Sequence, residues 1–201
     1  MKEKAVYVHG LGSGAASSTI STIRKVLPMY DWQAIEVNED PVDSLQIINA
    51  AIKDHCPKVL MGTSLGGMYL MYADISPCEE GAIRILCNPA CDIARNIRET
   101  IGFGVKEYFV PRLDGIQQYI LDEGVCARFE DFQVKYPTTP GKGHDYAIFS
   151  IHDELIGHTG VLANQVACYR AGYQIMIDAE GGHRLRREVI RQIKREIFEK
   201  K

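Results

Sequence analysis

Three residues that together could cleave an acyl bond occur in the order Ser64, Asp153 and His183 along this 201-residue chain. A serine hydroxyl is a weak nucleophile at neutral pH, so it needs a neighbouring histidine that accepts its proton. The histidine in turn needs a carboxylate that fixes its tautomer and stabilises its charged form. The sequence therefore predicts acyl-transfer chemistry, on condition that the fold brings three distant segments together.

Ser64 lies at the centre of the stretch Gly62-Thr63-Ser64-Leu65-Gly66, which fits the pattern G-x-S-x-G. The apolar run 59–61 before it is typical of a buried strand, and good helix formers follow it. A serine at the apex of a strand, sharp turn and helix is a nucleophile elbow, in which the two glycines leave room for the strand and helix to meet. An ordinary turn with a helix-capping serine is the alternative interpretation.

The proposed acid and base each follow a predicted strand. Asp153 comes after the apolar run 147–151, and His183 comes after the run 174–177, in a loop that contains glycine. Because parallel strands end at the same edge of a sheet, both side chains are expected at the edge that carries Ser64.

Two other acidic residues compete with Asp153 for the role of triad acid. Glu154 is its direct neighbour, and the pattern does not separate the two. Asp178 lies so close to His183 in the chain that we expect it to support its own loop.

Backbone amides must stabilise the negative oxygen of a tetrahedral intermediate. The amide of Leu65, directly after the serine, is the first expected donor. The loop after the first predicted strand supplies the second, with Leu11 as the expected donor and Gly12 as the alternative. His9 precedes the nucleophile in the chain, so we expect it to shape this loop and not to act as the base.

The remaining apolar pattern predicts the framework that must position these loops. Short apolar runs alternate with amphipathic segments, which is typical of a doubly wound α/β fold with a mostly parallel sheet of about six strands. One domain over residues 1–201 is expected. The predicted strands are 5–8, 32–37, 58–61, 82–87, 147–151 and 174–177, and the predicted helices are 18–27, 43–52, 65–75, 162–171 and 185–199.

The segment from about 93 to 145 interrupts this alternation with helical patches and scattered aromatic residues. It is too long for a simple crossover, so we expect a lid-like helical insertion over the ligand-binding edge of the sheet. The residues expected to contact substrate there are Gly10, Met68, Phe103, Tyr108 and Phe109.

Composition excludes several other classes of protein. The net charge of −3 implies no broad attraction to nucleic acid, and no apolar stretch approaches the roughly 20 residues of a membrane span. The six cysteines form no C-x-x-C pair, and the first apolar run is too short for a signal peptide, so a cytoplasmic protein is expected. The histidines show no metal-binding spacing, and the oligomeric state is left open.

The motifs resemble those of the YqiA-like bacterial esterases of the α/β-hydrolase superfamily. The resemblance implies a carboxylesterase that acts on esters or on acyl-coenzyme A thioesters, with Ser64, Asp153 and His183 as its triad. The long insertion at 93–145 departs from the compact members of that family. The motifs that carry the resemblance are His9-Gly10 with Ser13, Gly62 to Gly67, Asn88-Pro89-Ala90, His152-Asp153-Glu154 and Gly181-Gly182-His183.

Two rival functions remain. The loop Gly10–Ala15 fits G-x-G-x-x-A, so an NAD-dependent oxidoreductase could bind a dinucleotide there, with Glu36 or Glu39 on the ribose. A non-catalytic binding protein with a hydrolase fold is the other. Both leave the ordered set of serine, acid and histidine unexplained. The sequence therefore predicts a serine hydrolase that needs no cofactor and acts on a small-molecule ester or thioester.

Overall fold

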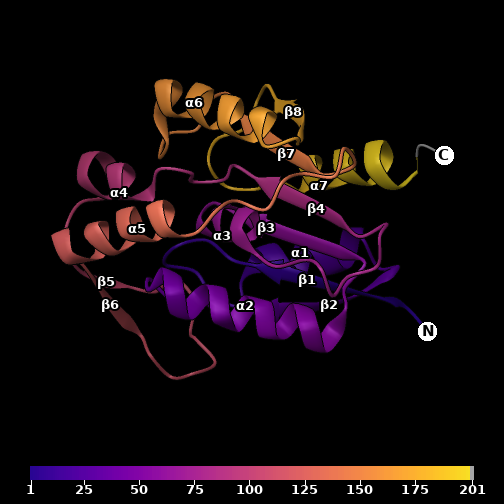
Figure 1. Ribbon diagram of the computed structural model, residues 1–201, viewed down its shortest axis with the longest axis horizontal. Coiled ribbons are helices and arrows are strands. Elements are labelled where there is room, and N and C mark those ends of the chain that lie inside the picture. The colour runs from indigo at the N-terminus through magenta and orange to yellow at the C-terminus, as the bar shows by residue number, and fades with distance from the viewer. Residues whose placement is uncertain (200–201) are drawn as a thin grey trace.

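The computed structural model describes residues 1–199 and contains a six-stranded parallel sheet (Figure 1). Its strands lie in the order β2-β1-β3-β4-β7-β8, so the predicted sheet is confirmed. The central strands are short and buried on both faces, as parallel sheets require, and they are mostly apolar except for Arg84 in β4. Their bounds are β1 Glu3–Val8, β2 Tyr30–Ile35, β3 Val59–Thr63, β4 Ile83–Cys87, β7 Tyr146–Ser150 and β8 Gln174–Asp178.

Helices cover both faces of this sheet. One face packs against α1 Ser18–Val26 and α7 Arg187–Ile193, which the π-helical turn η2 Lys194–Phe198 continues. The other face packs against α2 Pro41–His55, α3 Leu65–Tyr72 and α6 Gly157–Arg170. Strand side chains alternate between these layers, because successive residues of a strand point to opposite faces.

Helix α2 begins earlier than the apolar pattern predicts. Asp40 accepts hydrogen bonds from the amides of Val42 and Asp43, and Pro41 occupies the first helical position. Asp40 therefore caps the helix, and proline fits there because the first turn needs no amide donor.

The segment 93–145 differs in part from its prediction. It contains the expected helical pieces, α4 Ile93–Asn96, the π-helical turn η1 Ile97–Ile101 and α5 Glu123–Lys135. It also contains an antiparallel hairpin of β5 Gly104–Glu107 and β6 Gln118–Leu121, which the sequence analysis missed. Strand β5 is short and almost fully exposed, so it lacks the buried alternation that betrays a strand. Figure 1 shows these elements at the end of the molecule away from both termini.

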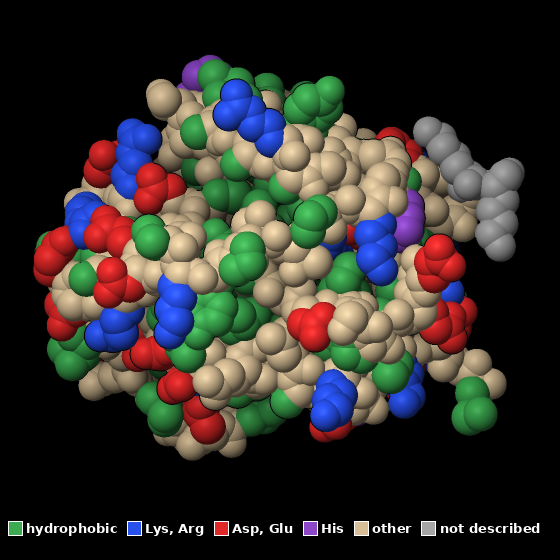
Figure 2. All heavy atoms as spheres, viewed as in Figure 1, with side chains coloured by type: hydrophobic (Ala, Val, Ile, Leu, Met, Phe, Trp, Pro, Cys, Tyr) green, Lys and Arg blue, Asp and Glu red, His purple; other side chains and the backbone are tan. Residues whose placement is uncertain are grey.

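The surface carries charges of both signs. Figure 2 shows acidic and basic side chains interspersed on one face, in keeping with the small net charge. Within residues 1–199, no helix has the length and apolar character needed to cross a bilayer.

A buried ion pair fixes the return from α5 to the sheet. Arg84 in β4 and Asp145 before β7 are both fully buried, and their side chains are joined at 2.7 Å. The guanidinium also donates to the carbonyl of Thr139 at 3.1 Å, and the Asp145 carboxylate accepts from the amide of Lys142 at 3.1 Å. The pair thus holds residues 139–145 against the amino ends of the strands, opposite the edge where the site lies.

Breaking this pair should destabilise the fold strongly. We expect Arg84→Met to lower the free energy of unfolding by about 3–5 kcal/mol, because Asp145 would keep a buried charge without its partner. Urea denaturation measures the change. The control is Arg98→Met, which removes exposed ion pairs to Glu123 and Glu130 and should barely move the midpoint. Equal shifts for the two variants would contradict the role assigned to Arg84.

Candidate active site

Ser64 stands between β3 and α3 in a strained backbone conformation, with φ 52° and ψ −119°. A Cβ atom on Gly62 would lie 2.5 Å from the Gly66 carbonyl oxygen, and one on Gly66 would lie 2.2 Å from that of Val8. Both glycines of the motif are therefore required by the close meeting of strand, helix and β1. The serine side chain makes no capping hydrogen bond to α3, so the helix-cap interpretation is wrong.

His183 and Asp153 meet at the carboxyl edge of the sheet. The Nδ1 atom of His183 lies 2.8 Å and 3.0 Å from the two carboxylate oxygens of Asp153. Asp153 is only 3% exposed, and one of its oxygens also accepts hydrogen bonds from the amides of Leu155 and Ile156. A carboxylate held in this way can fix the histidine tautomer that leaves Nε2 free to accept a proton.

The side chain of Glu154 contacts the backbone of His183 and not its ring. Its carboxylate accepts a hydrogen bond from the His183 amide at 2.9 Å, which lowers the pKa of Glu154 below its ordinary value. A Cβ atom on Gly182 would lie 2.6 Å from that carboxylate. Glu154 therefore supports the loop, whereas Asp153 contacts the ring.

Asp178 also supports the histidine loop and does not reach the ring of His183. It pairs with Arg186 at 2.6 Å and accepts from the amide of Glu180. A Cβ atom on Gly181 would lie 1.8 Å from its carboxylate. The two glycines before His183 are thus explained by two carboxylates that lie directly against the loop.

Asn88, directly after β4, holds the loop of His183, and the sequence analysis named it only as part of the motif Asn88-Pro89-Ala90. Its side-chain nitrogen donates to the carbonyl of His183 at 2.9 Å and to the hydroxyl of Ser150 at 3.1 Å. Its side-chain oxygen accepts from the Ser150 amide at 2.7 Å. Asn88 is buried and has a φ of 46°, a conformation that asparagine tolerates better than most residues. It joins the ends of β4 and β7 to the loop after β8 that carries His183.

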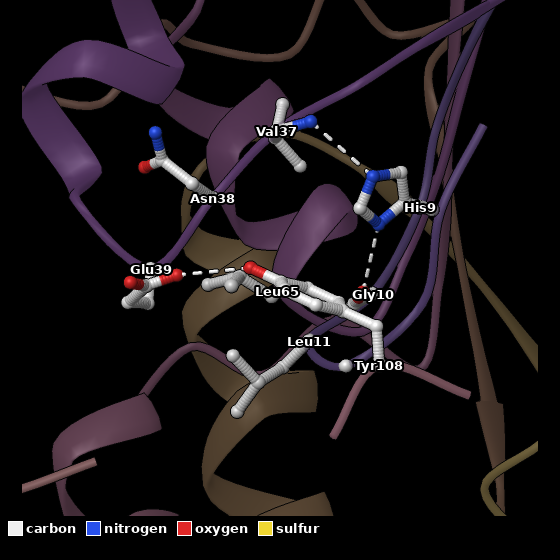
Figure 3. A pocket seen from close by; sticks show the side chains of 9 residues that line it. His9, Gly10, Leu11, Val37, Asn38, Glu39, Leu65 and Tyr108 are labelled. Carbon is white, nitrogen blue, oxygen red and sulfur yellow. Dashed lines mark hydrogen bonds between the residues drawn. The ribbon is translucent and has the colours of Figure 1, made fainter. Parts of the chain in front are cut away.

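A narrow crevice, too tight in this structure to hold a water molecule, lies beside the elbow (Figure 3). The loop after β1 forms one side of it, and a Cβ atom on Gly10 would lie 3.6 Å from the Ser64 hydroxyl. Leu65 begins α3, whose first amides have no acceptor within the helix. The lining residues are His9, Gly10, Leu11, Gly12, Val37, Asn38, Glu39, Leu65 and Tyr108.

Tyr108 closes the crevice from the hairpin side. Its hydroxyl lies 3.1 Å from the carboxylate of Glu39, and burial together with that negative charge raises the tyrosine pKa well above its ordinary value. The next residue, Phe109, donates its amide to the carbonyl of Gly12 at 2.7 Å. The hairpin is therefore joined to the loop after β1 by backbone as well as by side chains.

The residues predicted to contact substrate are placed differently from one another. Gly10 and Tyr108 line the crevice, as do the predicted oxyanion donors Leu11 and Leu65. Met68 is fully buried in the core. Phe103 and Phe109 have side chains that are 50% and 75% exposed on the insertion.

Among residues 1–199, no hydrogen bond joins the Ser64 hydroxyl to His183. The structure brings the predicted base His183 and the predicted acid Asp153 together, and it places Ser64 at the same edge of the sheet. Catalytic hydrogen bonds are often long in unliganded enzymes and shorten when substrate binds.

The rival dinucleotide site is already occupied by the protein itself. The Ala15 amide, which would face a pyrophosphate, donates to both oxygens of Glu36 at 3.2 Å and 3.4 Å. Glu39, the other acid expected at a ribose, accepts a hydrogen bond from the Tyr108 hydroxyl through its carboxylate. In the part of the chain that the structure describes, no three His, Cys, Asp or Glu side chains form a group that could hold a metal ion.

Comparison with known proteins identifies the fold. Est1E from Butyrivibrio proteoclasticus is similar at a TM-score of 0.65 and 16% identity, over 99% of this chain and 89% of that chain. Alpha/beta hydrolase domain-containing protein 10 from mouse is similar at a TM-score of 0.66 and 12% identity, over 96% of this chain and 88% of that chain. A monoacylglycerol lipase from Paleococcus ferrophilus is similar at a TM-score of 0.60 and 17% identity, over 90% of this chain and 86% of that chain. The architecture is therefore the α/β-hydrolase fold.

The search of curated proteins found no match. A family model does match residues 4–197, which is nearly the whole chain. The resemblance drawn from the motifs is thereby confirmed: the chain belongs to the uncharacterised protein family UPF0227, the YqiA-like family.

Proposed function

We propose that this protein is a serine hydrolase that cleaves carboxylic esters or acyl thioesters through an acyl-enzyme on Ser64. The observation that carries the proposal is the His183–Asp153 pair, which lies at the sheet edge where the strained elbow presents Ser64. A histidine that is oriented by a buried carboxylate, at the sheet edge that carries a strand-to-helix serine, is the arrangement that activates a serine.

The reaction has two steps. His183 Nε2 takes the proton of Ser64 as Oγ attacks the acyl carbonyl, and the amides of Leu65 and Leu11 bind the resulting oxyanion. The intermediate collapses, the bond to the leaving oxygen or sulfur breaks, and His183 returns the proton to that atom. Water, deprotonated by His183, then attacks the acyl-enzyme, and Ser64 regains its proton as the acid departs.

The comparisons support this chemistry by analogy. The similar structures include proteins named as an esterase and a monoacylglycerol lipase. We further propose a small-molecule substrate. We also propose a cytoplasmic location, because all six cysteines are unpaired, as is usual in a reducing compartment.

A panel of p-nitrophenyl esters and acyl-coenzyme A thioesters with acyl chains of graded length tests the proposal. We expect saturable turnover of at least one series without any added cofactor. The absence of turnover across the whole panel, together with a rise in melting temperature on addition of NAD, would favour the oxidoreductase instead. No turnover and no NAD effect would favour the non-catalytic binding protein.

A further inference from the structure

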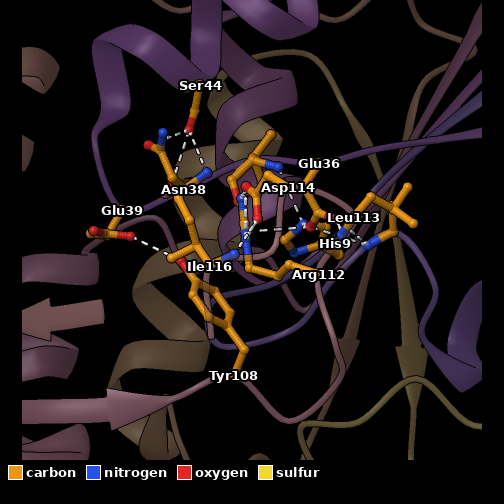
Figure 4. Close-up of polar contacts among 12 residues, drawn as sticks. His9, Glu36, Asn38, Glu39, Ser44, Tyr108, Arg112, Leu113, Asp114 and Ile116 are labelled. Atoms are coloured by element: carbon orange, nitrogen blue, oxygen red, sulfur yellow. Dashed lines mark hydrogen bonds and ion pairs between the residues drawn. The ribbon is translucent and has the colours of Figure 1, made fainter. Parts of the chain in front are cut away.

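Glu36, just after β2, lies outside the proposed triad, yet its carboxylate binds groups from two separate segments of the chain (Figure 4). From the loop after β1 it contacts His9 Nε2 at 2.9 Å and the Ala15 amide at 3.2 Å. From the insertion it contacts the Leu113 amide at 3.2 Å and Arg112 Nη1 at 3.3 Å.

The surroundings of Glu36 favour its charged form. Burial by itself would raise the pKa of this carboxyl, but the contact with His9, the Leu113 amide and the charge of Arg112 hold the pKa below its ordinary value. A Cβ atom on Gly14 would lie only 3.3 Å from the carboxylate, so the loop lies directly against it. The contacts leave the side chain 16% exposed.

His9 carries this restraint to the predicted oxyanion donor. Its Nδ1 atom lies 2.9 Å from the carbonyl oxygen of Gly10, which also accepts from the Ser13 amide at 3.2 Å. Because a carbonyl can only accept, Nδ1 must carry a proton, while Nε2 lies against both the Glu36 carboxylate at 2.9 Å and the Val37 amide at 3.2 Å. Nε2 donates to Glu36 when the ring is doubly protonated, and accepts from the Val37 amide when the ring is neutral. The Gly10 carbonyl and the Leu11 N–H belong to one planar trans peptide and point in opposite directions. Holding that carbonyl therefore fixes the direction of the Leu11 N–H.

We propose that Glu36 is a positioning residue for the oxyanion hole, acting through His9 and the Ala15 amide to fix the Leu11 amide. The inference rests on the proposed function and adds a residue to it. Because Arg112 and Leu113 bind the same carboxylate, the insertion is joined at this point to the loop that carries the oxyanion donor.

The test compares Glu36→Ala, His9→Ala and the double variant on an ester that the wild-type protein hydrolyses. Each single variant should lower kcat by about 100-fold with little change in KM, as expected when one oxyanion donor is misplaced. The double variant should lose little more than Glu36→Ala alone, because that variant already removes the contacts of the carboxylate with both His9 and the Ala15 amide. The inhibition constant of a trifluoromethyl ketone, which forms a tetrahedral oxyanion on serine, should rise in parallel with the loss of kcat/KM.

Asp145→Asn is the control for a purely structural effect, because it disturbs a buried ion pair at the opposite edge of the sheet. It should lower the melting temperature but leave kcat per folded molecule and the inhibition constant unchanged. If Glu36→Ala does not fold, His9→Ala alone decides. Unchanged kcat and ketone affinity in a folded variant of either residue would overturn the inference. An inactive wild-type protein would instead overturn the proposed function.

Discussion

Ser64→Ala is expected to lower kcat for ester hydrolysis by about 10⁵–10⁶-fold, since loss of the nucleophile removes the acyl-enzyme route altogether. The fold should persist, because the Ser64 hydroxyl makes no capping hydrogen bond and alanine keeps the Cβ atom. Steady-state kinetics and thermal melting, measured on the same preparation, separate the two effects.

The matched control is Ser18→Ala, which changes an exposed serine in α1. Its kcat and melting temperature should equal those of the wild-type protein. The Ser64→Ala protein must be purified free of contaminating esterases. If it then keeps more than a small fraction of the wild-type activity, Ser64 is not the nucleophile.

Asp153→Asn should have the second largest effect, a loss of about 10⁴-fold in kcat. The amide keeps the shape of the side chain but no longer stabilises a positively charged His183, and its NH₂ group can impose the wrong tautomer on the ring. Glu154→Gln should cost far less, because the glutamine oxygen can still accept the His183 amide hydrogen bond. Measuring kcat for both variants side by side checks the assignment.

The opposite order of effects would assign the acid role to Glu154. Melting curves are needed here too, because Asp153 also holds the amides of Leu155 and Ile156. An asparagine oxygen can accept those two hydrogen bonds, so the expected change in stability is small beside the change in kcat.

Local patterns made much of the fold predictable, together with the strand, sharp turn and helix around Ser64. The elbow could be predicted because Gly62 and Gly66, which its close packing requires, lie within the same five residues as Ser64. The parallel sheet could be predicted because its strands are continuous apolar runs. Asp153 and Glu154 could not be separated, because the two neighbours point to the ring and to the backbone of a histidine about thirty residues away.

Contacts between distant segments were beyond reach of the sequence. Arg84 interrupts an apolar run, and its burial depends on Asp145, which lies 61 positions further along. Glu36 was considered only as a ribose ligand, since nothing local shows that His9 and Arg112 would converge on it. The β5–β6 hairpin escaped prediction because its short strands leave most side chains in solvent.

Labelling with a fluorophosphonate, followed by mass-spectrometric mapping of the modified peptide, tests the central claim most directly. The reagent bonds covalently to a serine that a base has activated. We predict one phosphonyl group per molecule, located on Ser64. Stoichiometric labelling of another serine, such as Ser13 or Ser150 beside the site, or hydrolysis of esters without any labelling of Ser64, would contradict the account.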